Sequence, residues 1–341
     1  MKNWWKYLCA VLLVYSIIAG LFVPLGPGIS NLSPVTVTPG ETVSINITGY
    51  NTHFDKETPQ FWLKNDTVAI CATGVNISDR KNTTAVFELP VSVPTRTFTL
   101  IGASEYDGLF LLDNALMIKG DFERGVPSNT CSIIVKNKSA SFFSFPNREI
   151  LNETIRNLYF HVPMWWAMMF MFLLSVIFSI GHLGNFQLRR DYMAAEAAKT
   201  GMLFGILGLI TGMIWARFTW GAWWIADPRL NGSAATLLAY AAYFILRNSM
   251  NEEQRRARVA AVYNIFAFIM MLVLIMIYPR MADSLHPGSG GNPAFSSYDL
   301  DQNMRLVFYP AVIGWFLLAL WIYQLRWRIL KIKKSIEGDV I

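Results

Sequence analysis

Cysteine is scarce in this sequence of 341 residues, which contains only Cys9, Cys71 and Cys131. No Cys-x-x-Cys motif occurs, and this absence argues against a thiol reductase. Cys71 and Cys131 lie in the same segment between two apolar runs and could pair in an oxidising compartment, whereas Cys9 lies within the first run. The sequence leaves open whether that disulfide forms.

Charged residues are also few, at 15% of the chain against 53% hydrophobic residues and a mean hydropathy of +0.34. The chain is too apolar for an ordinary soluble domain and too charged for membrane spans alone. Apolar runs close to the ~20 residues that cross a bilayer occur at six places. They are Tyr7–Val23, Leu158–Ile180, Met202–Phe218, Ser233–Leu246, Val259–Tyr278 and Leu306–Leu325. We therefore expect an α-helical membrane protein of about six transmembrane helices, the fourth being the shortest.

The segment from Pro24 to Asn157 has a different composition, rich in Thr, Val, Asn and Ser. Apolar and polar residues alternate in it, as at Val43/Ile45/Ile47 and Phe98/Leu100, and Pro-Gly, Thr-Gly and Asp-Gly turns interrupt it. About 130 residues are enough to bury a core. The pattern predicts an inserted all-β extracytoplasmic domain, of the sandwich type.

The distribution of Lys and Arg over the short loops predicts the orientation. One side collects 14: Lys2, Lys6, Arg189, Arg190, Lys199, Arg247, Arg255, Arg256, Arg258, Arg326, Arg328, Lys331, Lys333 and Lys334. The other side has four: Arg217, Arg229, Arg280 and Arg305. Both termini are thus predicted to be cytoplasmic, and the net charge of +6 needs no nucleic acid to explain it. The first run also resembles a signal peptide, but it continues to Val23 without a clear small-x-small site, which favours an uncleaved anchor.

Trp220, Trp223 and Trp224, followed by Asp227 and Arg229, lie between two apolar runs on the predicted outer side. Trp favours the membrane interface, and charged groups at that depth need a partner or a function. Three indoles there would form a platform for a planar apolar ligand such as a porphyrin. The alternative interpretations are an aromatic belt for the Trp residues and a local ion pair or loop cap for Asp227 and Arg229.

Two of the four histidines share a side with this tryptophan-rich segment. His161 begins the second apolar run and His286 lies in the last outer loop, whereas His182 falls on the cytoplasmic side and His53 in the β segment. Two neutral imidazoles on opposite faces of a porphyrin could complete the coordination of its iron. Each could equally be a hydrogen-bonded boundary residue.

The segment resembles the tryptophan-rich WWD signature of the CcmC/CcsA family of cytochrome c biogenesis, roughly WGxxWxWDxRLT. Trp220, Gly221, Trp224, Asp227, Arg229 and Leu230 occupy its positions, and Trp223 matches a further Trp of CcmC members. LYFHVP around His161 and LHPGS around His286 resemble the two histidine motifs of CcmC. The departures are Ala226 in place of a Trp, Pro228 after the Asp and Asn231 in place of Thr. The resemblance covers about Ile155 to Arg328 and not the β domain.

The resemblance implies a multi-pass protein of the bacterial inner membrane with a periplasmic β domain. It would bind haem b, non-covalently and transiently, at its outer face, and it would present the haem to a CcmE-like chaperone without catalysing bond formation. His161 and His286 would be the axial ligands, and the WWD segment would bind the porphyrin. Further partners would be a CcmD-like small subunit, a CcmA/CcmB-type ABC transporter and membrane lipid.

The expected domains are a first transmembrane helix (1–25), a β domain (26–155), a haem-handling membrane domain (156–328) and a basic tail (329–341). Two alternative functions come from other classes. A CcsA-like haem lyase or channel would need further histidines, which the sequence lacks, and the chain also has no Cys-x-x-Cys-His site for covalent haem of its own. A membrane-anchored adhesion or sensory protein would depend on the β domain and tolerate changes in the WWD segment.

Overall fold

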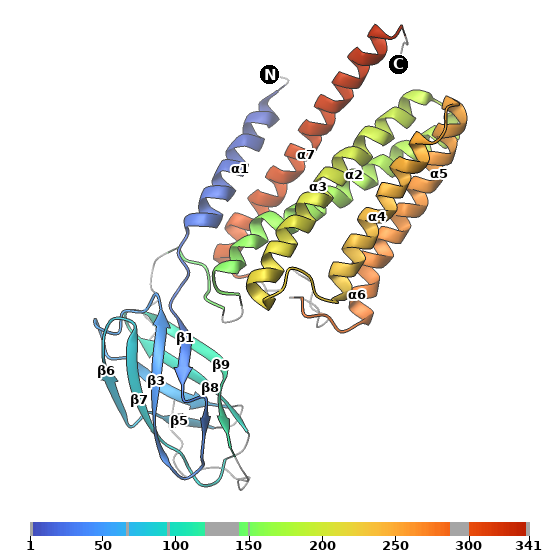
Figure 1. The fold of residues 1–341 in the computed structure, drawn as a ribbon. Coiled ribbons are helices and arrows are strands. Elements are labelled where there is room, and N and C mark those ends of the chain that lie inside the picture. The colour runs from blue at the N-terminus through green and yellow to red at the C-terminus, as the bar shows by residue number, and fades with distance from the viewer. Residues whose placement is uncertain are drawn as a thin grey trace. The chain divides into compact units, whose positions relative to one another are not determined.

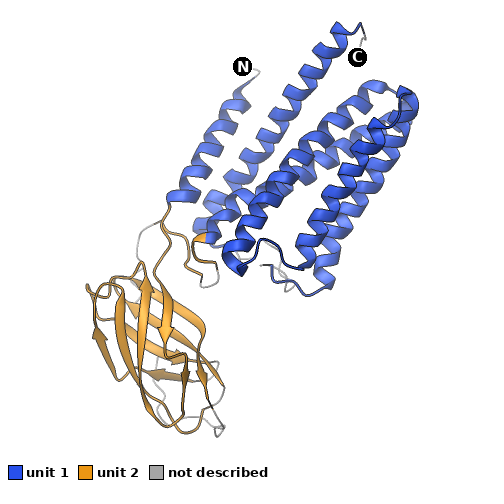
Figure 2. Ribbon diagram, in the orientation of Figure 1, with its two compact units in different colours: residues 1–22, 154–341 blue, residues 23–153 orange. Residues whose placement is uncertain are grey.

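A computed structural model describes most of the chain, and the ranges it covers are 3–65, 68–93, 96–119, 143–148, 151–286 and 300–338. The chain forms two compact units, which Figure 2 distinguishes by colour. One unit combines Met1–Phe22 with Thr154–Ile341 and is helical, and the other is Val23–Glu153 and contains the strands. Each unit is described by itself.

The helical unit is built from long helices, with α1 preceding the β unit in the chain and the others following it (Figure 1). The elements are α1 (Trp4–Phe22), the 3-10 helix η1 (Asn152–Asn157), α2 (Leu158–Asn185), α3 (Leu188–Trp220), α4 (Pro228–Asn248), α5 (Glu253–Leu272), the π-helix η2 (Val273–Ile277), α6 (Tyr278–Met281) and α7 (Gln302–Ile336). Asp227 and Asp301 cap α4 and α7, because each side chain accepts a backbone N–H of the first turn.

Among the described residues, five helical stretches are long and apolar enough to cross a membrane. They are α1, η1 with α2, α3, α5 with η2 and α6, and α7. Five of the six predicted apolar runs thus lie in helices that are long and apolar enough to cross a membrane. The remaining run, Ser233–Leu246, lies within α4, which is helical over 21 residues but less apolar because Asn231, Gly232 and Ser233 occupy its first turns.

The core of the helical unit lies between α2, α3, α4, α5 and α7. The rings of Phe172 on α2 and Tyr240 on α4 stack with centroids 3.5 Å apart and 4° between their planes. Outside this core, α1 packs along α7, where the Cys9 thiol contacts the Gly314 carbonyl oxygen at 3.5 Å. The two ends of the chain therefore lie at the same end of the unit (Figure 1).

A row of glycines on α3 allows α2 to approach closely. A Cβ atom added at any of them would lie within about 3.0 Å of a side chain on α2. From one end of the contact to the other, the facing pairs are Gly212 with His161, Gly208 with Trp165, Gly205 with Met168, and Gly201 with Phe172. Gly201/Gly205 and Gly208/Gly212 form two GxxxG spacings, and both serve close helix packing in this structure.

The β unit contains a four-stranded sheet, in the order β1-β3-β7-β6, and a five-stranded sheet, in the order β2-β9-β8-β4-β5. The strands are β1 (Gly28–Ser33), β2 (Thr36–Val37), β3 (Thr42–Tyr50), β4 (Gln60–Lys64), β5 (Ala69–Cys71), β6 (Gly74–Ile77), β7 (Asn82–Glu88), β8 (Thr97–Ser104) and β9 (Gly108–Ile118). Residues of both sheets belong to one hydrophobic cluster, which includes Ile45 and Ile47 of β3 and Phe98 and Leu100 of β8. The alternation seen in the sequence therefore marks residues that are buried here.

The two cysteines within the described residues differ in state. Cys9 is buried with a free thiol. Cys71, at the end of β5, is disulfide-bonded. Cys131, its expected partner, lies outside the described residues.

Candidate functional site

His161 lies in the first turn of α2, and α3 fixes the direction of its ring. Its Nδ1 atom lies 3.0 Å from the Gly208 carbonyl oxygen and 3.2 Å from the Thr211 hydroxyl oxygen. Because a carbonyl oxygen only accepts hydrogen bonds, Nδ1 must carry the proton and donate it. The neutral imidazole then has its lone pair on Nε2, the atom with which such a ring binds a metal.

Gly212 gives the same ring the space that it occupies. A Cβ atom at this position would lie 2.7 Å from Cε1 of His161. The imidazole also contacts Trp165 edge to face, with ring centroids 6.1 Å apart. The site around His161 therefore depends on a residue that has no side chain.

His286 follows α6 and packs against two tryptophans. Its ring centroid lies 5.2 Å from that of Trp220, at 73°, and 5.5 Å from that of Trp215. The two indoles contact each other at 4.7 Å and 75°. Trp215 and Trp220 both come from the last turns of α3, so the end of this helix provides an aromatic wall for the imidazole.

Asp227 connects the tryptophan-rich segment to the segment that carries His286. Its Oδ1 accepts the Arg229 N–H at 2.8 Å and lies 3.2 Å from Nδ1 of His286. Its Oδ2 accepts the Ser284 hydroxyl at 2.8 Å and the Leu285 N–H at 2.9 Å. The carboxylate is buried, with 3% of the residue exposed, and one side chain thus positions both the start of α4 and the histidine.

These contacts determine the charges at the site. Burial alone would raise the pKa of Asp227, but the hydrogen bonds from Ser284, Arg229 and Leu285 lower it below its usual range. Burial lowers the pKa of His286 to about 4, and Arg229 acts in the same direction while Asp227 opposes them. The imidazole is therefore neutral at neutral pH, and its Nδ1 donates to the Asp227 carboxylate.

The two histidines lie at the same end of the helical unit. His161 faces Gly212 and His286 faces Trp215, which are one turn apart on α3, and the two imidazoles are close enough to interact electrostatically. The α3 end, the α4 start and α6 gather at this end, opposite the chain termini (Figure 1). The structure thus brings together residues that are 125 positions apart in the sequence.

The remaining candidates surround this pair less closely. Trp223 and Trp224 are exposed, at 54% and 38%, and Trp224 donates its indole N–H to the Asn231 side chain at 3.2 Å. Gly221 ends α3 with a φ of +78°, a conformation that favours glycine, and Arg217 donates to its carbonyl oxygen. Of the three indoles of the motif, Trp220 contacts His286, whereas Trp223 and Trp224 have large exposed fractions.

Arg229 lies in the first turn of α4 and is partly buried. It interacts electrostatically with Asp227 and with Arg280 of α6, which carries the same charge. Two guanidinium groups that repel each other next to one carboxylate favour the binding of a further anion. Arg280 was not among the candidates that the sequence indicated at this site.

Sequence reasoning also missed other contacts. They are the contacts of Trp215 with His286, of Thr211 with His161 and of Ser284 with Asp227. An apolar helix rich in aromatic residues gives no signal for which indole faces a neighbouring loop. The Gly208-to-Gly212 spacing was a visible signal, but only the structure shows that its surface receives His161.

The model of the family described as CcmC, Heme exporter protein C, matches residues 119–339. Curated proteins named Heme exporter protein C are similar to this chain. The one from Bradyrhizobium diazoefficiens is 32% identical over 121 residues, which cover 36% of this chain and 46% of the relative. Those from Paracoccus denitrificans and Escherichia coli K12 are 27% and 26% identical over 51% and 52% of this chain, and 72% and 70% of their own lengths. The strands β1 to β9 precede the matched residues.

Proposed function

The chain belongs to the heme exporter protein C (CcmC) family, and we propose that it binds haem and delivers it for cytochrome c maturation. The haem would bind at the end of the helical unit where His161 and His286 lie. The observation that carries the proposal is the pair of imidazoles at one end, each with Nδ1 next to a hydrogen-bond acceptor. Haem is the cargo of the protein, and no bond-forming catalysis by the chain is proposed.

The chemistry of the two histidines fits the iron of a porphyrin. In both rings the acceptor next to Nδ1 favours the tautomer with its lone pair on Nε2, and outer hydrogen bonds of this kind orient metal-binding histidines. His161 is positioned by a backbone carbonyl and His286 by a carboxylate. We infer that they bind the iron from opposite faces of haem b, non-covalently.

The residues around the pair fit the rest of the ligand. The Trp215 and Trp220 rings provide an apolar surface for the porphyrin. Arg229 and Arg280 are suited to meet its two carboxylates by charge-assisted hydrogen bonds. Both arginines come from elements that adjoin the Asp227 carboxylate or the segment leading to His286.

The exposed Trp223 and Trp224 support a site that is open at one edge. A ligand with an accessible edge can leave faster than an enclosed one, and affinity differences act mainly on the rate of release. We therefore infer transfer to a periplasmic chaperone of the CcmE type. A CcmD-like subunit and a CcmA/CcmB-type transporter would be the further partners.

The topology that we infer has six transmembrane helices, including α4. Because α3 ends at the site and α5 begins at the opposite end of the unit (Figure 1), α4 must connect the two ends. The excess of Lys and Arg assigns the chain termini to the cytoplasm and the site to the periplasmic side of the bacterial inner membrane.

We infer that the β unit is a periplasmic sandwich, since its two sheets contribute to one hydrophobic cluster. It would dock the chaperone or shield the site. Replacing Gly28 to Asn152 by a short linker should impair transfer more than haem loading. Normal cytochrome c maturation without this segment would show that it is dispensable.

Absorption spectroscopy tests haem binding by the purified protein. We expect a Soret band in the wild type and a weaker or shifted band in His161→Ala and in His286→Ala. His53→Ala is the matched control, because this histidine belongs to the β unit. An unchanged spectrum in both site variants would refute axial ligation by the pair.

A further inference from the structure

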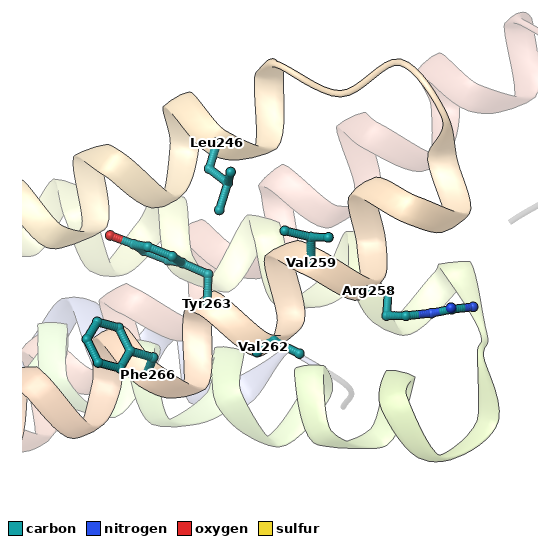
Figure 3. Close-up of a pocket in the computed structure, with 6 residues that line it drawn as sticks. All are labelled: Leu246, Arg258, Val259, Val262, Tyr263 and Phe266. Carbon is teal, nitrogen blue, oxygen red and sulfur yellow. The ribbon is translucent and has the colours of Figure 1, made fainter.

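An apolar groove runs between α4 and α5, away from the haem site. Leu246 of α4 faces a row of α5 side chains across it (Figure 3). The α5 residues that line it are Arg258, Val259, Val262, Tyr263 and Phe266. Its volume of about 560 Å³ falls within the range of about 300–1,000 Å³ of small-molecule sites.

The walls of this groove offer an occupant almost no polar contact. Val262 and Phe266 are more than half exposed, although they lie in a stretch apolar enough to span a membrane. The Tyr263 hydroxyl donates to the Ala239 carbonyl oxygen at 3.1 Å, so its one proton is not available to an occupant of the groove. An occupant must therefore be apolar along the length of the groove, as an acyl chain is.

Arg258 places a positive charge at one end of the groove (Figure 3). Its guanidinium lies 5.3 Å from the centre of the Phe186 ring. Nearby arginines are paired, Arg247 with Asp191 and Arg256 with Glu253, whereas no carboxylate of the described residues lies within ion-pair distance of Arg258. The charge is thus available to an anion that enters with the apolar occupant.

We propose that the groove is a binding site for an anionic phospholipid. An acyl chain lies between α4 and α5, and the phosphate meets the Arg258 guanidinium by a charge-assisted hydrogen bond. Arg258 belongs to the side of the membrane that is rich in Lys and Arg, where anionic headgroups attract basic residues by about 1 kcal/mol per charge. A transmembrane helix of a partner would fill the same apolar surface but would not need a phosphate at Arg258.

Native mass spectrometry of the full chain in detergent tests the site with dioleoylphosphatidylglycerol and dioleoylphosphatidylcholine. The anionic lipid, phosphatidylglycerol, has one net negative charge more than phosphatidylcholine, and we therefore expect the wild type to bind it about fivefold more tightly than phosphatidylcholine. Arg258→Gln should reduce this preference to near unity. Arg255→Gln is the matched control, since it removes an exposed arginine of the same helix that does not line the groove.

A second pair of variants tests the groove itself. Val262→Trp fills it and should weaken both lipids severalfold, whereas Ile245→Trp adds the same ring at an exposed position of α4 outside the lining. The proposal is overturned if the wild type shows no preference for the anionic lipid, or if Arg258→Gln and Arg255→Gln show the same preference. It is also overturned if Val262→Trp and Ile245→Trp bind the lipids with the same affinity. None of these outcomes depends on haem, so they are separate from the test of the proposed function.

Discussion

Replacing Gly212 by alanine should displace His161 and weaken haem binding without unfolding the protein. The added Cβ would lie 2.7 Å from Cε1 of His161, whereas ordinary contacts begin at 3.4 Å. The imidazole must therefore retreat by about 0.7 Å, the difference between these two distances. Its hydrogen bond to the Gly208 carbonyl, now 3.0 Å, is lengthened or misaligned by such a movement.

The expected magnitude follows from two opposing effects on stability and one effect on binding. Overpacking costs about 1–3 kcal/mol, while alanine in place of glycine in a helix returns up to about 1 kcal/mol. Loss of an outer hydrogen bond of a metal-binding histidine reduces metal affinity about 10- to 100-fold. We therefore expect a folded protein with haem affinity reduced by that factor.

Haem titration in detergent, followed at the Soret band, measures this change, and circular dichroism checks the fold. Gly184→Ala is the matched control, because its Cβ on α2 would meet nothing within 4 Å. If Gly212→Ala and Gly184→Ala bind haem equally tightly, the absence of a side chain at Gly212 does not determine the position of the His161 imidazole for haem binding.

Three other predictions follow from the same structure. Asp227→Asn should reduce haem affinity about tenfold or more, because an amide nitrogen replaces one oxygen that accepts two hydrogen bonds. Asp283→Asn, at a nearby exposed position, should leave the affinity unchanged, and equal affinities of the two variants in Soret titrations would contradict this prediction. The pKa of His286 is lowered to about 4, so between pH 6.5 and about 4 the unfolded chain binds a proton that the folded apo-protein does not, and the folded state should lose stability as the pH falls through this window. The thermal unfolding temperatures of the wild type and of His286→Gln should therefore depend differently on pH in this window, and parallel pH dependences would refute the lowered pKa. Asp191→Asn leaves Arg247 buried without its bidentate partner and should destabilise the protein by about 3–5 kcal/mol, which thermal unfolding in detergent can measure. Lys333→Gln, which removes one partner of the exposed Lys333–Glu337 pair, should cost less than about 1 kcal/mol.

Much of the fold was predictable because it depends on local patterns. The alternation at Val43/Ile45/Ile47 corresponds to β3, where Ile45 and Ile47 are buried. Long apolar runs identified the five membrane-capable stretches. The fourth run was harder to assign, since α4 begins with small and polar residues that lower its hydropathy.

The candidate site was predictable only in its residue types. Asp227 and Arg229 were noticed because charges beside an apolar run need a partner, but the partner His286 is 59 positions away. No periodicity encodes that contact, which depends on how the segment after α6 folds back to α4. Likewise Trp215 has the same local context as many packing residues, and only the tertiary structure places it against His286.

Electron paramagnetic resonance of the ferric haem complex tests whether His161 and His286 bind the iron, because it reports the number of strong axial ligands. We expect a low-spin signal in the wild type, a high-spin signal in both His161→Gly and His286→Gly, and recovery of the low-spin signal in each variant on addition of imidazole. A low-spin signal that persists in both variants without imidazole would contradict coordination of the iron by this pair.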